Sequence, residues 1–400
     1  FYPDSLDEEY AEQRTEAAVT DAATVVITDR DADGLACAAL VRAARDAALS
    51  AVAAESALAV RLGDGDESDA EEGDADDGEK ESEDGSDEGP PDSSVALVGA
   101  SPYSLEDALD RVARFAPEGV EVFVCDLCPD EYRYVEDELP ALVDRASSVR
   151  WFDHHQWDDE VAAQVRDAGV DLVVGASDQE CSADVTLRSL DVEFPQHLRD
   201  LVAVTRDHDL WLKEDPRSDD LADYAHWADD EEYLAIVSEH GPDLPETVHD
   251  YLAERRVEKE ALIETAVERA TTHEVGPWTV ATTYCRCSQN EVADTLREAG
   301  ADAAVIVKPA GSASIRGSEA FARCHEVAGQ VNGGGHPKAS GCKPDIYDDM
   351  LDYAAHWTSD GRTTRRVILA AFERVAEDVE PEGEADVDDA AAGEDDETAE

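Results

Sequence analysis

The chain has 400 residues, a formal net charge of −66 and an isoelectric point near 4.1. Its length is sufficient for two or three domains with substantial hydrophobic cores. No run of about 18 apolar residues and no charged-then-apolar leader occurs, so we expect a soluble, cytoplasmic protein without membrane association.

Part of the negative charge lies in two tracts of Asp, Glu, Gly, Ser and Ala, Gly63–Asp92 and Glu377–Glu400. They carry net charges of −15 and −13, and they have too few apolar side chains to offset chain entropy, which predicts disorder. The remaining chain keeps −38, and the whole chain has only six lysines among its many acids. This composition resembles that of proteins from salt-accumulating archaea, in which molar salt screens charge repulsion.

The first predicted strand is the β-branched run Thr24–Thr28, which is followed by the turn Asp29–Gly34 and a helical pattern from Leu35 to about Asp46. The turn holds three alternating carboxylates at the carboxyl end of the strand. A solvated acidic turn is the plain alternative. A calcium loop of the EF-hand type is excluded, because Val41 stands where that loop needs Glu and a strand precedes it.

Two further predicted strands end in the same way. Val120–Cys125 is followed by Asp126, and the apolar run that begins at Val149 ends in Asp-His-His. A predicted helix that begins at about His197 then ends near Asp207. Ligands collect at the carboxyl ends of strands in open α/β sheets, and so many carboxylates in one crevice require either protonation or cations. We therefore predict a pair of divalent metal ions in a cluster formed by Asp29, Asp31, Asp33, Asp126, Asp153, His154, His155 and Asp207.

The cysteines give a weaker signal. The close pairs are Cys125-x-x-Cys128 and Cys285-x-Cys287, whereas a structural zinc site usually needs four ligands in matched pairs. We expect the cysteines to be reduced, buried small hydrophobic residues.

The ordered motifs resemble the four motifs of DHH phosphoesterases, and the first resembles the RecJ-like branch more than the nanoRNase branch. Two later stretches, Ser314–Gly317 and Val331–His336, resemble the DHH-associated C-terminal domain of that family. One departure is Ile27, where many relatives have histidine. In the fourth motif Asp209 competes with Asp207, and the spacing to Leu210 favours Asp207.

The resemblance implies an α/β fold in which a parallel-sheet DHH domain is joined by a long helix to a smaller α/β C-terminal domain. The implied division is a DHH domain at 1–240 with a disordered acidic insertion at 63–92, a linker helix at 241–275, a DHH-associated substrate-binding domain at 276–376 and a disordered tail at 377–400.

The resemblance also implies roles for individual residues. The metal ligands, for two Mn²⁺ ions or alternatively Mg²⁺, would be Asp31, Asp33, Asp126, His154 and Asp207, with Asp29 a lesser candidate. Asp126 would bridge the ions, His155 would face the scissile phosphate, and Asp153 would orient an imidazole. The substrate clamp would consist of Arg316, Gly334, Gly335, His336 and Lys338. Without the resemblance, an ordinary glycine-rich turn is the better interpretation of Gly333–Lys338.

The implied activity is metal-dependent phosphodiester hydrolysis, by a single-strand-specific exonuclease of RecJ type acting on DNA or RNA. A nanoRNase or cyclic-dinucleotide phosphodiesterase acting on short oligonucleotides is an alternative, because the sequence contains no recognisable OB-fold or basic, aromatic-rich tract that could hold a long strand. A scaffold without activity, bound to replication or repair proteins, is the alternative from another class.

Overall fold

The computed structural model describes residues 4–63, 95–102 and 104–377. The tracts predicted to be disordered, 63–92 and 377–400, lie outside these ranges apart from their first residues. Contacts divide the chain into two compact units, Phe1–Leu252 and Ala253–Glu400, called here the N-terminal and C-terminal units. The division falls inside helix α10 (Glu246–Glu268), which therefore contributes to both.

The N-terminal unit contains a parallel sheet of five strands in the order β2-β1-β3-β4-β5. The strands are β1 (Thr24–Thr28), β2 (Val95–Gly99), β3 (Glu121–Cys125), β4 (Ser148–Asp153) and β5 (Asp171–Val174). All five residues of β1 are buried, as expected for a parallel strand covered on both faces.

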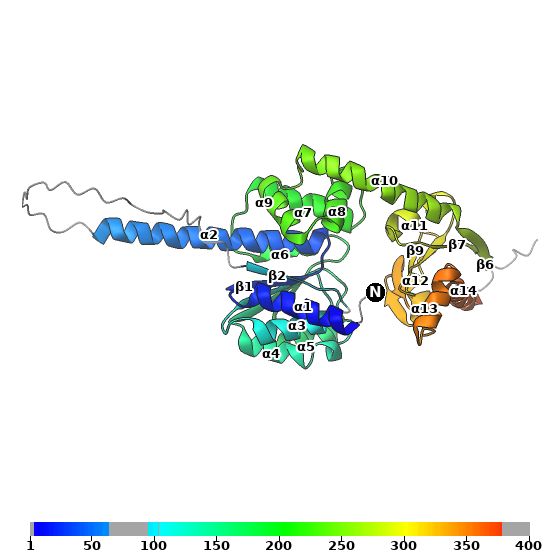
Figure 1. The fold of residues 1–400 in the computed structure, drawn as a ribbon, viewed down its shortest axis with the longest axis horizontal. Coiled ribbons are helices and arrows are strands. Elements are labelled where there is room, and N and C mark those ends of the chain that lie inside the picture. The colour runs from blue at the N-terminus through cyan, green and yellow to red at the C-terminus, as the bar shows by residue number, and fades with distance from the viewer. Residues whose placement is uncertain (1–3, 64–94, 103, 378–400) are drawn as a thin grey trace, which may run out of the picture. The chain divides into compact units, whose positions relative to one another are not determined.

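Helices cover both faces of this sheet (Figure 1). One layer consists of α1 (Asp4–Val19), α3 (Leu105–Phe115), α4 (Glu138–Arg145) and α5 (Asp159–Asp167), with the short 3₁₀ helix η1 (Tyr132–Tyr134) nearby in the chain. The other consists of α2 (Ala32–Gly63), α6 (Ser182–Ser189), α7 (Gln196–Asp209), α8 (Ser218–Trp227) and α9 (Asp230–His240). Alternate β1 side chains enter the two cores: Val26 packs with the α2 layer, and Val25 and Ile27 pack with the α3 layer.

The C-terminal unit contains a mixed sheet of six strands in the order β10-β11-β9-β8-β7-β6, in which β7 and β8 are parallel and the other pairs are antiparallel. The strands are β6 (Thr271–Val275), β7 (Trp278–Tyr284), β8 (Ala303–Val307), β9 (Ala313–Gly317), β10 (Gly333–Gly335) and β11 (Ala339–Cys342). The helices are α11 (Gln289–Glu298), α12 (Cys324–Gly329), α13 (Met350–Thr358) and α14 (Arg362–Glu377). Residues of α11 and of α12 with α14 belong to two separate apolar cores.

The structure confirms an α/β chain with a parallel five-stranded sheet and a second sheet. Two helices differ in length from the predicted ones. Helix α2 continues to Gly63 rather than ending near Asp46. The predicted linker helix at 241–275 is shorter, because α10 ends at Glu268 and β6 follows. The β-branched residues of Thr271–Val275 favour a strand, and Gly276, at a φ of +58°, makes the turn into β7.

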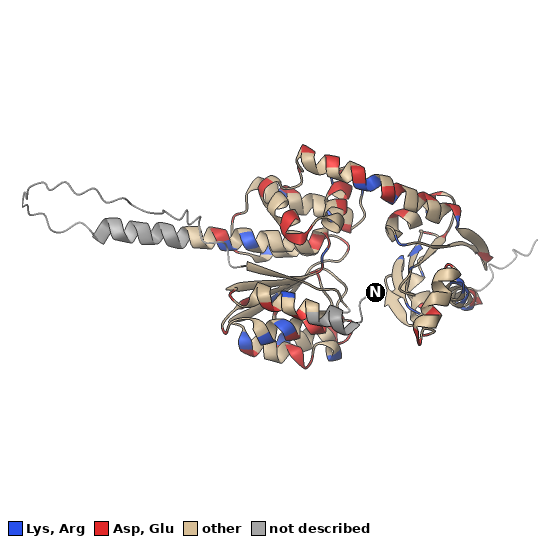
Figure 2. Ribbon diagram, viewed as in Figure 1, with Lys and Arg blue, Asp and Glu red and all other residues tan. Residues whose placement is uncertain are grey.

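None of the described helices has both the length and the hydrophobicity needed to cross a bilayer. Acidic residues recur along the helices of both units, whereas the strands are nearly free of them (Figure 2). The excess charge of the described residues therefore lies mainly on the helices that surround the sheets.

We expect the melting temperature to rise by about 10 °C or more between dilute buffer and molar KCl. For units of this size, this corresponds to an increase of roughly 3–5 kcal/mol in the free energy of unfolding. The reason is that mutual repulsion of the acidic helices opposes the compact state until salt screens it. Melting curves in KCl and in matched sucrose check this, because sucrose stabilises without screening charge. Equal stability in dilute buffer and molar KCl would contradict the halophilic interpretation.

Candidate metal centre

Three neighbouring strands deliver polar residues to one edge of the parallel sheet. The order β1-β3-β4 places Asp29, which follows β1 after Thr28, on the same edge as Asp126 and Asp153. His154 and His155 come directly after β4. This juxtaposition is the one expected from strands that end in carboxylates.

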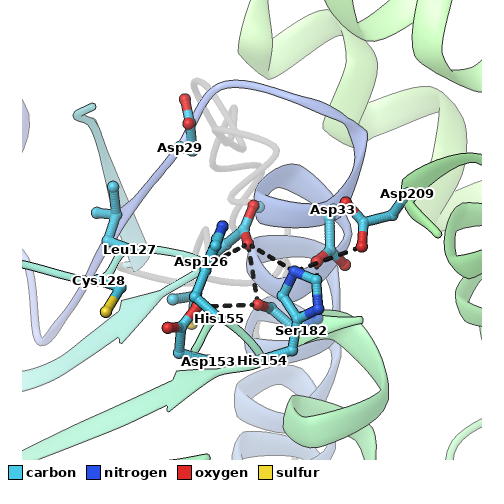
Figure 3. A network of polar contacts seen from close by, with 12 residues as sticks. Asp29, Asp33, Asp126, Leu127, Cys128, Asp153, His154, His155, Ser182 and Asp209 are labelled. Atoms are coloured by element: carbon cyan, nitrogen blue, oxygen red, sulfur yellow. Dashed lines mark hydrogen bonds and ion pairs between the residues drawn. The ribbon is translucent and has the colours of Figure 1, made fainter. Parts of the chain in front are cut away.

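Five side chains form the carboxylate–imidazole cluster: Asp33, Asp126, His154, His155 and Asp209. They make two overlapping triads, one of Asp126, His154 and His155 and one of Asp33, His154 and Asp209. Within each triad the ligand atoms lie within 4.8 Å of one another. His154 Nε2 lies 3.4 Å from Asp209 Oδ2 and 3.9 Å from Asp126 Oδ1, so this imidazole is shared by the two triads (Figure 3).

Asp33 is held by the start of helix α6. Its Oδ2 accepts a hydrogen bond from the Ser182 backbone N–H at 2.7 Å, and its Oδ1 accepts one from Ala183 N–H at 2.9 Å. These donors are unsatisfied within the helix, and the positive end of the helix dipole favours a carboxylate there. Asp33 is only 2% exposed, so its position is fixed by both packing and hydrogen bonds.

Asp126 has a left-handed backbone, with a φ of +56°. Asp tolerates this conformation better than most residues, and such strain is common at functional sites. Its backbone N–H still donates to Phe152 O at 3.1 Å, so the turn begins without loss of pairing to β4. Ser182 Oγ donates to Asp126 Oδ1 at 2.9 Å, which holds the carboxylate inside the cluster.

Asp153 does not belong to either triad. Its Oδ1 lies 2.8 Å from His155 Nδ1, and its Oδ2 accepts a hydrogen bond from Trp157 Nε1 at 2.6 Å. Asp153 is fully buried, whereas the His155 side chain is 44% exposed. Burial alone would lower the pKa of His155, but the hydrogen bond and charge of Asp153 outweigh it and raise the pKa to about 9.

Burial and mutual repulsion raise the carboxyl pKa values of the cluster. Burial first, then the charges of neighbouring aspartates, raise the pKa of both Asp33 and Asp209 to about 7. The same causes raise the pKa of Asp126 well above its usual range. These three carboxyl groups repel one another when they are ionised. Cations bound between them would offset this repulsion and stabilise the carboxylate form.

The cluster fits divalent cations. His154 Nδ1 and Asp209 Oδ2 are buried without a hydrogen-bond partner, and both belong to residues of the second triad. Carboxylate oxygens with imidazole nitrogens suit Mn²⁺ or Mg²⁺ better than soft metals.

The structure places the two acids of the fourth motif in different surroundings. Asp209, at the end of α7, faces Asp33 and His154, whereas Asp207 Oδ1 accepts a hydrogen bond from Glu214 N–H at 2.8 Å. Residues two positions apart on a helix point about 200° away from each other, so only one of the two can face the cluster. The acid of α7 that the structure places in the cluster is therefore Asp209, whereas the spacing favours Asp207.

The two other acids of the first motif lie outside both triads. Asp31 Oδ1 accepts hydrogen bonds from Asp33 N–H at 2.9 Å and Gly34 N–H at 3.0 Å, so it caps the start of α2. Asp29 accepts a hydrogen bond from Arg30 N–H at 2.7 Å and lies apart from the cluster in Figure 3. Burial, with repulsion from Asp31, raises the pKa of Asp29 to about 6.

The residues predicted to bind substrate are in the C-terminal unit. Arg316 on β9 donates from Nε to Asn290 Oδ1 at 2.9 Å and from Nη1 to Ser340 O at 3.3 Å. His336 and Lys338 occupy the loop between β10 and β11, where His336 N–H donates to Ala339 O at 2.7 Å. The Lys338 ammonium is paired with Glu319.

The three glycines before His336 differ in what the fold requires of them. A Cβ at Gly333 would lie 2.2 Å from Gly341 O, and Gly335 has a φ of +130°. Packing and backbone conformation therefore explain these two. At Gly334 a Cβ would meet nothing within 4 Å, so the described part of the fold does not require glycine there.

Sequence reasoning missed Ser182 and Trp157, which position Asp126 and Asp153. Ser182 opens α6 just after β5, a place where helix-capping residues are ordinary. Its contact with Asp33 joins residues 149 positions apart, and no local pattern marks it.

We expect the metal-free protein to lose stability as pH rises from about 4 to about 7. The pKa values of Asp33 and Asp209 in the folded protein lie above their unfolded values, so the native state binds more protons in this window. The raised pKa of His155 acts in the same direction at higher pH. Melting with EDTA should therefore be higher at about pH 5.5 than at about pH 8, and Mn²⁺ should stabilise more at pH 8.

The control for this experiment is Asp209→Asn, which removes one of the repelling carboxylates and should reduce the pH dependence of the metal-free protein. A melting temperature that rises with pH in EDTA would contradict the electrostatic description of the cluster.

No protein-family model matches the chain, and no curated protein matches it. Solved structures do. An exonuclease RecJ bound to manganese has a TM-score of 0.50 and 13% identity, over 93% of this chain and 95% of that one. The DHH domain of a member of the s1p family of ribosomal proteins has a TM-score of 0.56 and 14% identity, over 94% of this chain and 90% of that one.

RecJ from Thermus thermophilus, in complex with Mn²⁺, has a TM-score of 0.53 and 15% identity, over 92% of this chain and 55% of that one. Identities this low establish the fold alone. The chain has the fold of DHH-domain proteins.

Proposed function

We propose that the protein is a metal-dependent phosphodiesterase of the DHH phosphoesterase type, acting as an exonuclease on single-stranded nucleic acid. The observation that carries this proposal is the pair of triads that share His154 at the carboxyl edge of the parallel sheet. Their donors belong to one compact unit and are buried or half-buried, as a preorganised site requires. The similar RecJ structures, which are described as bound to manganese, support the same chemistry.

Asp33, Asp126, His154 and Asp209 would hold the ions. Divalent cations bound there would activate water and stabilise the charge that develops during in-line displacement at phosphorus. Asp126 belongs with His154 to one triad and accepts a hydrogen bond from Ser182, so its carboxylate is held in place as a ligand. Asp33 is fixed equally firmly by the start of α6.

His155 would face the substrate phosphate. Its Nδ1 is bonded to Asp153, which leaves Nε2 of this half-exposed ring to donate a hydrogen bond to a phosphate oxygen. With a pKa of about 9 the ring is cationic at neutral pH, which suits an anionic partner. Trp157 holds Asp153 from the other side, so the orientation of the ring depends on two hydrogen bonds rather than one.

The loop between β10 and β11 would bind a phosphate of the substrate, together with Arg316. Because the fold does not require glycine at position 334, the open space there would let an anion approach the backbone closely, with Gly335 and His336 beside it. Hydrogen bonds from Nε to Asn290 and from Nη1 to Ser340 O fix the plane of the Arg316 guanidinium, which leaves Nη2 to donate to a phosphate oxygen. Lys338 is paired with Glu319 on the surface, a weak interaction that phosphate can replace.

The test is hydrolysis by the purified full chain in molar KCl with Mn²⁺ or EDTA. The substrates form a series from dinucleotides through longer single strands of DNA and RNA, with a cyclic dinucleotide and a duplex beside them. We expect Mn²⁺-dependent release of mononucleotides from single strands, and no release by Asp209→Asn. Cleavage confined to dinucleotides or the cyclic compound would favour the short-substrate enzymes, and no cleavage of any substrate would overturn the proposal.

A further inference from the structure

Two cysteines of the C-terminal unit lie close together in the turn between β7 and α11. Cys285 follows β7 directly, and Cys287 comes just before Ser288, the capping residue of α11. Cys285 Sγ donates a weak hydrogen bond to Cys287 O at 3.9 Å, and the two side chains are also close enough to hydrogen-bond with each other. Cys285 is 7% exposed and Cys287 is half-buried, so the pair is accessible from the Cys287 side and is not simply part of a core.

A lysine lies beside the pair. β7 and β8 are parallel with Tyr284 opposite Val307, and Cys285 N–H donates to Val307 O at 3.1 Å, so Lys308 is the cross-strand neighbour of Cys285. Lys308 is half-buried, and no carboxylate forms an ion pair with it among the residues the structure describes. In a chain with 98 acidic residues, an ammonium group left beside a sulfur atom is unusual.

The charges around the pair favour a thiolate at Cys285. The hydrogen bond from Cys287 outweighs burial, and Lys308 and Arg269 add to it, so that the pKa of Cys285 falls to about 7. The same hydrogen bond and burial, with Glu291, raise the pKa of Cys287. Cys285 is therefore the more acidic thiol of the pair and the better nucleophile.

The first turn of α11 connects this pair to Arg316. Ser288 Oγ accepts a hydrogen bond from Glu291 N–H at 3.4 Å and so caps the helix. Gln289 Oε1 accepts one from Ser314 Oγ at 2.8 Å, and Asn290 Oδ1 accepts one from Arg316 Nε at 2.9 Å. A displacement of Cys287 toward β7 acts directly on the residues that hold β9.

We propose that Cys285 and Cys287 form an oxidation-sensitive thiol pair, whose disulfide loosens the first turn of α11 and releases Arg316 from Asn290. The disulfide and its effect on α11 stand independently of the proposed hydrolysis. The consequence for substrate binding rests on the proposed function, because it assumes that Arg316 binds phosphate.

Hydrogen peroxide is the oxidant we assign, because it is small enough to reach a mostly buried sulfur. The Cys285 thiolate attacks one peroxide oxygen, an S–O bond forms, the O–O bond breaks, and hydroxide leaves to give a sulfenic acid. Hydroxide takes the Cys287 proton and becomes water. The Cys287 thiolate then attacks the Cys285 sulfur, the S–S bond forms, and the second hydroxide leaves. This second hydroxide takes up the proton that Cys285 released to solvent when it ionised. In total two thiols lose two electrons, and one peroxide is reduced to two waters.

Peptide mapping tests the chemistry. Trypsin cleaves after Arg286, which separates the two cysteines, so a disulfide keeps peptides 270–286 and 287–297 joined until it is reduced. We expect the joined pair from peroxide-treated full-length protein. Cys287→Ser should instead give a sulfenic acid at Cys285 that reacts with dimedone, and Cys342→Ser, a buried cysteine on β11, should still give the joined pair. Unmodified Cys285 and Cys287 in the treated wild type would overturn the proposal.

Hydrogen exchange tests the coupling to α11. We expect faster amide exchange at 289–292 in the oxidised protein, reversal by reductant, and no such change in treated Cys287→Ser. The KM for a five-nucleotide oligodeoxyadenylate should rise by about 10-fold or more, with kcat less affected, because a charged hydrogen bond is worth roughly 1.5–3 kcal/mol.

A joined peptide pair with unchanged exchange would overturn the proposed loosening of α11. If the protein did not hydrolyse the oligonucleotide at all, the proposed function would fail, while mapping and exchange would still decide the thiol proposal.

Discussion

Asp209→Asn should abolish manganese-dependent hydrolysis, and Asp207→Asn should leave most of it. Asp209 shares a triad with Asp33 and His154, whereas Asp207 belongs to neither triad. Replacing residues that only orient a ligand typically costs 10–100-fold, so loss of a ligand itself should cost at least about 100-fold. Asp207 is occupied by Glu214 N–H, and the carbonyl oxygen of an asparagine can accept the same hydrogen bond.

The two variants are matched, because each replaces one carboxylate by its amide within the last turn of α7. Single-turnover rates with saturating Mn²⁺, metal content after gel filtration and melting curves should be measured together. Normal activity and metal content in Asp209→Asn, or their loss in a folded Asp207→Asn, would contradict this prediction and indicate that Asp207 is the ligand.

Asp126→Asn should lower the number of bound manganese ions, whereas His336→Ala should leave both in place and weaken substrate binding. Asparagine is the correct replacement for Asp126, because it tolerates the φ of +56° that alanine does not. The variant therefore removes the charge without straining the turn. His336 is in the C-terminal unit, and the triads consist entirely of residues from the N-terminal unit.

For His336→Ala we expect a higher KM and, because a misplaced phosphate can cost about 100-fold, a lower single-turnover rate as well. Metal titration by calorimetry should separate the two variants even without a substrate. If His336→Ala lost manganese, or if Asp126→Asn kept two ions and normal turnover, the proposed division between metal binding and substrate binding would be wrong.

The sequence was sufficient for the parallel sheet and for most of the cluster, because each strand is a β-branched or apolar run that ends in a polar residue. Local patterns of this kind identified Asp126 and His154 directly. The choice between Asp207 and Asp209 needed the helical phase of α7, which depends on how its apolar face packs in the core and not on the spacing to Leu210. Similarly, β6 was missed because the helical pattern of α10 continues almost to Thr271.

Asp33 and Ser182 are 149 residues apart in the chain, and their hydrogen bond closes the cluster. The site therefore cannot be assembled until β1, α2 and α6 have all reached their native positions, which makes it a late product of a fold with many long-range contacts. A metal that binds only the native state stabilises it by about 2.7 kcal/mol at a concentration 100 times its Kd. Manganese in the refolding buffer should then shift the equilibrium of the N-terminal unit from incompletely folded states to the native state. It should also protect this unit from proteases that cleave transiently opened chains.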